Sequence, residues 1–157
     1  MNNLKKIKIL FSLCGFIFLF SCGYQPILTE TYQKFGISSF EIEGDKKLGQ
    51  SLINRFGKIE NAKNQLVFKI KSSKKREISS KSSAGEVLEY TVTINIDVDV
   101  FPVLSSNKIL SKKYSQSNTY KASSLYVDSL NREKKIIDTS IKDISNKISR
   151  QLNLIYK

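Results

Sequence analysis

Histidine is absent from the sequence, and the two cysteines, Cys14 and Cys22, are the residues with the most distinctive chemistry. Without an imidazole group, the serine–histidine arrangement of many hydrolases is excluded. A metal site built from histidine and several cysteines is excluded as well. The remaining reactive groups, on Ser, Tyr, Lys, Asp and Glu, fall into no local signature. We therefore expect no catalytic activity, no metal site and no other cofactor.

The segment before Cys22 has the composition of a secretory signal. Residues 1–21 contain three lysines near their start and no acid, and a long apolar run follows the lysines. That run is shorter than the roughly 20 apolar residues that a transmembrane helix needs, but it suits a signal peptide. An uncleaved membrane anchor is the alternative. The pattern favours removal of residues 1–21 as a signal peptide.

The residues at the end of this segment resemble the lipobox of bacterial lipoproteins. Leu19 is the aliphatic residue at position −3, Ser21 is the small residue at −1, and Cys22 is the cysteine that receives lipid. Phe20 departs from the pattern at −2. Cys14 lies inside the apolar run and follows a large leucine, which does not fit the pattern. The resemblance implies that the mature protein begins at Cys22 and is anchored there by lipid, with palmitate among the acyl chains.

Gly23 bears on which membrane holds the protein. In the lipoproteins that this lipobox resembles, an aspartate directly after the cysteine retains the protein at the inner membrane. Glycine stands there instead. The resemblance therefore implies an outer-membrane lipoprotein that faces the periplasm. Residues 22–34 contain Gly, Pro and polar side chains without a period, which predicts a lipid-anchored tether.

Hydrophobic periods predict the elements of residues 35–157. Strict alternation from Leu88 to Val100 predicts a strand of roughly 43 Å with one buried and one solvated face. Apolar residues at helical spacing from Leu48 to Ile59 predict a helix that Asp45 can cap and whose end Gly57 weakens. A longer apolar stripe predicts a second helix over 124–156, capped by Ser124, Asp128 or Ser129. The other predicted strands cover 35–42, a run from Gln65 toward a hairpin tip at 79–85, and 109–121.

The order of these elements is strand, helix, three strands, helix. A sheet with one apolar face needs a cover, and two amphipathic helices supply it. The sequence therefore predicts an α+β domain over residues 35–157. Its architecture is a two-layer sandwich, in which a four-stranded sheet is covered by two helices.

Basic residues are the candidates for binding an anionic ligand. The formal charge of the chain is +12, and loss of the three lysines before Cys22 leaves +9. A basic surface favours nucleic acid, anionic headgroups or a phosphorylated glycolipid. A sequence rich in Lys, Ile, Asn and Ser can also be basic through genome composition alone, so charge by itself decides little. Lys74, Lys75 and Arg76 precede the predicted hairpin tip, and Lys81 lies on it. Near the start of the last helix lie Lys121, Arg132 and Lys134.

The order of motifs resembles the LPS-assembly lipoprotein family (LptE). The features that carry the resemblance are Cys22 followed by Gly23 and Tyr24, the order of strands and helices, and Glu89-Tyr90 at the start of the long strand. The resemblance implies a plug inside an outer-membrane β-barrel, the LptD-type LPS translocon. It also implies a role in assembling that barrel and contact with lipopolysaccharide on its way to the outer leaflet.

The family's basic contacts do not align onto single positions of this chain. Five residues are the candidate lipopolysaccharide contacts: Lys74, Lys75, Arg76, Lys81 and Arg132. Lysines and arginines pair well with the phosphates of lipid A. Nucleic acid is not an expected partner.

Two other functions remain open. One is an accessory lipoprotein of a phospholipid or solvent transport system, which also uses small α+β domains. The other is a structural envelope lipoprotein without a ligand. The partner separates the first from the LPS-assembly role, because one partner is a barrel that encloses the domain and the other is a complex that spans the periplasm.

Lipidation at Cys22 is directly testable. Cys22→Ala removes the thiol that would receive lipid, so we expect an unprocessed precursor without acyl chains. Mass spectrometry of the membrane-extracted protein measures both properties. A lipidated, processed product from the variant would refute the assignment and direct attention to Cys14.

Overall fold

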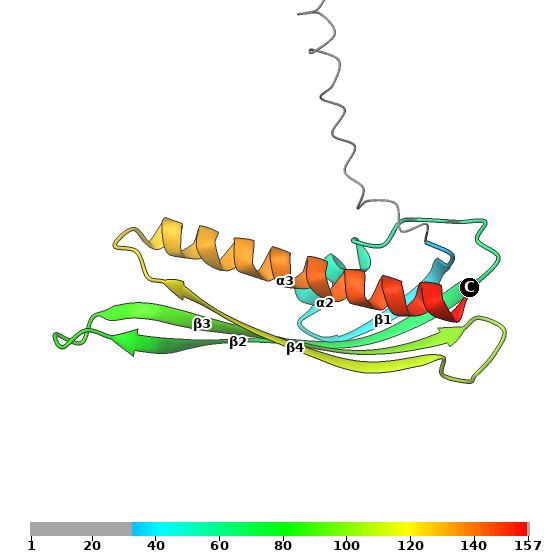
Figure 1. The fold of residues 1–157 in the computed structure, drawn as a ribbon, viewed down its shortest axis with the longest axis horizontal. Coiled ribbons are helices and arrows are strands. Elements are labelled where there is room, and N and C mark those ends of the chain that lie inside the picture. Colours follow the sequence, from blue (N-terminus) through cyan, green and yellow to red (C-terminus); the bar gives the residue numbers. More distant parts are fainter. Residues whose placement is uncertain (1–32, 157) are drawn as a thin grey trace, which may run out of the picture. The chain divides into compact units, whose positions relative to one another are not determined.

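The computed structural model describes residues 33–156 (Figure 1). The predictions for the signal peptide 1–21 and for lipidation of Cys22 concern residues outside this range. The elements in chain order are β1 (Gly36–Gly44), α2 (Lys46–Ile53), β2 (Gln65–Lys81), β3 (Val87–Pro102), β4 (Leu110–Lys121) and α3 (Tyr126–Ile155). None of the helices in the described range is long and apolar enough to cross a membrane.

The four strands form one mixed sheet in the order β1-β2-β3-β4. β1 and β2 are parallel, whereas β2–β3 and β3–β4 are antiparallel hairpins. The parallel pair needs a crossover, which α2 and the loop after it provide. Both helices lie on the same face of the sheet (Figure 1). The predicted two-layer α+β sandwich is therefore confirmed.

The core lies between the sheet and the helices. Alternate residues of β3, such as Ile94 and Ile96, are at most 1% exposed, as the alternation predicts. Ile144 and Ile148 of α3 are fully buried against this face. The side chains that form the core are Phe35, Leu48, Leu52, Ile53, Phe56, Leu66, Phe68, Ile70, Val92, Ile94, Ile96, Val98, Val100, Leu110, Tyr120, Ile141, Ile144, Ile148 and Leu152.

The opposite face of the sheet is polar. Hydroxyl groups pair across β3 and β4, with Thr91 hydrogen-bonded to Thr119 at 2.8 Å and Thr93 to a serine hydroxyl at 2.6 Å. Asp99 accepts hydrogen bonds from Lys108 Nζ at 2.7 Å and from Ser111 Oγ at 2.6 Å. These two bonds, that of Lys108 first, lower the pKa of Asp99. The predicted solvated face is present.

The cover is shorter than the strands it protects. β2 has 17 residues and β3 has 16, so each strand extends over roughly 55 Å. α3 has 30 residues and is roughly 45 Å long. The β2–β3 hairpin therefore reaches past the first turn of α3 at one end of the domain (Figure 1).

β1 contains a bulge that its apolar spacing requires. Ile37 is opposite Leu66 and Phe40 is opposite Phe68, with one extra residue of β1 between them. Without that extra residue, Ile37 and Phe40 would point to opposite faces, because side chains alternate along a strand. The bulge brings both side chains to the helix-covered face. Phe40 stays 44% exposed there, at the edge of the sheet.

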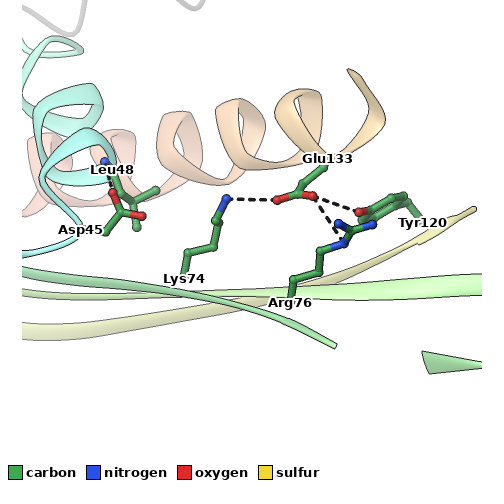
Figure 2. Close-up of polar contacts among 6 residues, drawn as sticks. All are labelled: Asp45, Leu48, Lys74, Arg76, Tyr120 and Glu133. Carbon is green, nitrogen blue, oxygen red and sulfur yellow. Dashed lines mark hydrogen bonds and ion pairs between the residues drawn. The ribbon is translucent and has the colours of Figure 1, made fainter. Parts of the chain in front are cut away.

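α2 begins where the sequence predicts and ends earlier. Asp45 caps it by accepting a hydrogen bond from Leu48 N at 3.1 Å (Figure 2). The helix stops at Ile53 and does not reach Ile59, so that part of the prediction is wrong. Phe56 turns into the core, where its ring lies 5.4 Å from that of Phe68. Sequence spacing does not distinguish this packing of a single aromatic ring from another helical turn.

Because neighbouring residues of β3 face opposite sides of the sheet, we expect their substitutions to destabilise the domain to very different extents. Ile94→Asp buries a carboxylate without a partner, which costs several kcal/mol and is comparable to the stability of a small domain. Asn95→Asp lies on the exposed face and should change the free energy of unfolding by less than about 0.5 kcal/mol. Urea denaturation of the two variants measures the difference. Equal destabilisation would contradict the two-layer arrangement.

Candidate functional site

The helix-covered face of β2 changes from apolar to polar toward the hairpin. Ile70 is buried, and the next residues on the same face are Ser72, Lys74 and Arg76. Strand alternation aims the two cations under α3 rather than into open solvent. They therefore need an acidic partner on the helix.

Glu133 of α3 is that partner (Figure 2). Only 7% of Glu133 is exposed. One carboxylate oxygen accepts from Lys74 Nζ at 3.0 Å, and the other accepts from the Tyr120 hydroxyl at 3.1 Å. The second oxygen also lies 3.5 Å from Arg76 Nε. A buried carboxylate with two cations and a hydroxyl donor joins α3, β2 and β4 at this point.

Aromatic rings support the guanidinium of Arg76. Its central carbon lies 3.8 Å from the centre of the Tyr90 ring and 5.9 Å from that of Tyr120. This is a cation–π arrangement, which favours arginine over lysine. Burial, followed by the negative charge of Glu133, raises the pKa of the Tyr120 hydroxyl. Tyr120 therefore stays protonated and can donate its hydrogen bond to the carboxylate.

The cluster carries an excess positive charge. Glu133 contributes one negative charge, against one positive charge each from Lys74 and Arg76. The side chains of the two cations are 36% and 29% exposed, so this charge reaches the surface. A partly desolvated cation attracts an anion more strongly than a fully hydrated one does.

Several exposed apolar side chains belong to the elements at the hairpin end of the domain. Ile78 of β2 is 48% exposed and Leu88 of β3 is 47% exposed. The segment that leads into α3 adds more, since Leu125 is 65% and Tyr126 67% exposed. The β2–β3 hairpin and the start of α3 lie at the same end of the sheet (Figure 1). Val127 and Leu130 complete the apolar group.

The same elements also carry exposed cations. Lys81, Lys121, Arg132 and Lys134 are all exposed. Arg132 is held at the end of β4, where its guanidinium donates to the Lys121 carbonyl at 3.2 Å. We call the combined group the hairpin-end surface, which consists of Ile78, Leu88, Leu125, Tyr126, Val127 and Leu130 with Lys81, Lys121, Arg132 and Lys134. A hollow of about 480 Å³ lies on it, lined by Ser80, Val87, Leu88, Glu89, Lys121 and Ala122.

The predicted basic run does not act as one unit. Lys74 and Arg76 lie on the covered face and bind Glu133. Lys75 lies on the opposite face, where its amine is 2.6 Å from Glu77. Lys81 and Arg132 lie on the hairpin-end surface. Of the five candidate contacts, only these last two belong to the hairpin-end surface.

Sequence reasoning missed Glu133 and the apolar start of α3. Glu133 occupies the gap in the helical stripe between Leu130 and Ile137, where an apolar residue would otherwise lie. Lys74 and Arg76 are in phase with the buried residues of β2, which is a second signal. The two signals together identify a buried ion cluster.

The start of α3 also differs from the expected caps. Leu125 occupies the cap position and its side chain makes no capping hydrogen bond. Ser129, one of the expected caps, instead accepts a hydrogen bond from Ser123 N at 2.9 Å. The first turn therefore presents apolar side chains rather than a polar cap. Within residues 33–156, no group of three His, Cys, Asp or Glu residues is placed to hold a metal ion.

Solved bacterial lipoproteins have the same fold. The rare lipoprotein B of Shewanella oneidensis is 13% identical with a TM-score of 0.52, over 75% of this chain and 96% of that protein. Lipoprotein B of Nitrosomonas europaea is 15% identical with a TM-score of 0.53, over 75% and 82% of the two chains. A minor lipoprotein of Acinetobacter baumannii is 16% identical with a TM-score of 0.50, over 76% and 90%.

No family model and no curated protein sequence matches the chain. At these identities, the structural likeness establishes the fold. The class defined here is thus a small α+β domain of the kind found in these lipoproteins, with a cationic and apolar surface at one end.

The Glu133 cluster predicts that loss of Glu133 destabilises the domain more than loss of Glu77, an acid on the exposed face. Glu133→Ala leaves Lys74 and Arg76 under the helix without a counter-charge. We expect a loss of about 2 kcal/mol, less than for a fully buried pair because both cations are partly exposed. Glu77→Ala, on the exposed face, should cost less than about 0.5 kcal/mol. Urea denaturation provides the comparison, and equal losses would contradict a stabilising role for the cluster.

Proposed function

We propose that this chain is an outer-membrane lipoprotein that binds lipopolysaccharide through its hairpin-end surface. It plugs an outer-membrane β-barrel of the LptD type, assists the assembly of that barrel, and helps deliver lipopolysaccharide to the outer leaflet. The observation that carries the proposal is the combination of exposed apolar side chains with bordering cations at one end of the domain.

The hairpin-end surface has the two chemistries that a phosphorylated glycolipid requires. Lysine and arginine pair with phosphate oxygens, and arginine does so through two parallel hydrogen bonds. Binding of acyl chains to exposed apolar side chains such as Leu125 and Tyr126 is favourable, because it removes apolar surface from water. A soluble domain without a ligand or partner rarely leaves so many neighbouring apolar residues exposed.

Two further observations support the proposal. The amino-terminal residues resemble a lipobox ending at Cys22, and the proteins with the same fold are described as lipoproteins. A lipid anchor would hold the domain at the membrane where the glycolipid is delivered.

The barrel and the glycolipid should respond differently to salt. Lysine–phosphate pairs are screened over about 8 Å at physiological ionic strength, so glycolipid binding should weaken as salt rises. A plug enclosed by a barrel buries a large interface and should remain bound. Purification of the tagged full chain from outer membranes at low and high salt, followed by identification of a large barrel, tests the second contact.

Removal of three surface cations should weaken glycolipid binding. In the full chain, Lys81→Gln, Lys121→Gln and Arg132→Gln remove charges from the hairpin-end surface but leave the Glu133 cluster intact. We expect about a tenfold loss of affinity for lipopolysaccharide in detergent at low salt, since each exposed pair contributes roughly 0.5 kcal/mol. Capture of the barrel should be unchanged.

A matched control removes the same charge elsewhere. The control combines Lys46→Gln and Lys47→Gln on α2 with Lys63→Gln in the following loop. This variant should leave glycolipid affinity unchanged. Equal loss in both variants would indicate attraction to net charge alone. Tighter binding to phospholipid than to lipopolysaccharide would favour the phospholipid-transport alternative. No lipid binding and no barrel would leave a structural lipoprotein.

A further inference from the structure

A groove separates α3 from the free edge of β4. Within residues 33–156, β4 pairs with β3 on one side only, so its other side presents unpaired backbone groups. The groove has a volume of about 380 Å³. It is lined by Gln116, Ser117 and Asn118 of β4 and by Lys135, Ile136, Thr139, Ser140 and Asp143 of α3. Its floor is fixed by a hydrogen bond of 3.1 Å from Asn118 Nδ2 to Ser140 Oγ.

The two edges of the sheet are not equivalent. β1 is interrupted by the bulge between Ile37 and Ser39. β4 pairs with β3 over 12 consecutive residues without a register shift. A regular edge of this length is a template for an additional strand. A helix beside the edge provides side chains that can select which strand is added.

Two charged side chains of α3 can determine which strand is added. Lys135 and Asp143 are exposed at the two ends of the groove, and neither forms an ion pair with another residue between 33 and 156. They are eight residues apart, or roughly 12 Å along a helix. Residues i and i+4 of a strand lie on the same face about 13.5 Å apart. A strand with charges four residues apart therefore matches the spacing of Lys135 and Asp143.

We infer that the groove between β4 and α3 binds an extended peptide strand of a partner protein, with an acidic and a basic side chain four residues apart. The strand pairs antiparallel with β4 and thus runs in the direction of α3. Its acidic residue meets Lys135 and, toward its carboxyl end, its basic residue meets Asp143. A small residue between them faces Ile136 and Thr139.

This inference does not rest on the proposed glycolipid function. The groove and the hairpin-end surface share no residue, so each can fail without the other. Self-association through β4 is disfavoured because an antiparallel pair centred on Ser117 would place Lys113 of each copy opposite Lys121 of the other. A partner strand of mixed charge avoids that repulsion.

The test uses the full chain in detergent micelles and two labelled nine-residue peptides with blocked ends. TVETSTKVT has the acid before the base, and TVKTSTEVT has the same composition in the opposite order. We expect the first to bind about fivefold more tightly by fluorescence anisotropy, as two exposed ion pairs would provide. Equal binding of both peptides, or binding of neither, would overturn the inference.

A charge swap on the protein supplies the decisive comparison. Lys135→Glu with Asp143→Lys should reverse the preference, so that TVKTSTEVT binds more tightly. Glu60→Lys with Lys63→Glu makes the same exchange on a distant loop and should leave the preference unchanged. A variant that keeps the original preference despite the swap would exclude these two residues as the selecting pair.

Backbone pairing is tested separately. Two versions of TVETSTKVT carry N-methyl groups on alternate residues, in opposite phases. Only one set of amides in a strand faces its neighbour, so one version should lose binding and the other should keep it. If both versions bind like the parent peptide, the strand does not pair with β4.

Discussion

The length of the β2–β3 hairpin is the constraint on which the rest of the structure depends. Its two strands reach roughly 55 Å, while α3 covers about 45 Å of the same face. Where cover is complete, the face is built from side chains such as Ile70 and Ile96. Toward the hairpin, the same face holds the ion cluster under the first half of α3, and exposed apolar residues follow. The difference in length therefore leaves part of this face uncovered at the end of the domain that carries the candidate binding surface.

The ion cluster is the transition between these two regions. Glu133 attaches the first half of α3 to the hairpin without continuing the apolar core to the end of the sheet. A buried charge group seldom adds much stability over an apolar replacement, but removal of one partner is costly. Its contacts hold the third turn of α3, at Glu133, over β2 and β4. An apolar contact at this position would hold the helix but would provide no cations. The ion cluster provides Lys74 and Arg76 at the end of the domain that carries Leu125 and Ile78.

Much of the fold follows from local patterns. The alternation from Leu88 to Val100 predicts β3, and Asp45 predicts the start of α2. The early end of α2 was not predictable, because Phe56 satisfies helical spacing but packs on rings distant in the sequence. The candidate site was harder to predict from the sequence for a similar reason. Lys74 meets Glu133 across 59 residues, and only the assembled sheet and helix bring the two together.

The pairing of β1 with β2 has a mechanical consequence. The chain enters the domain at Gln33 and Phe35, directly before β1. β2 runs parallel to β1 from there to the hairpin. Suppose that the amino-terminal side is held and the hairpin is gripped by a partner. Tension then pulls β1 and β2 in opposite directions along their length. Their hydrogen bonds are loaded together, in shear, rather than opened one after another, so the parallel pair resists extension between the two points of attachment.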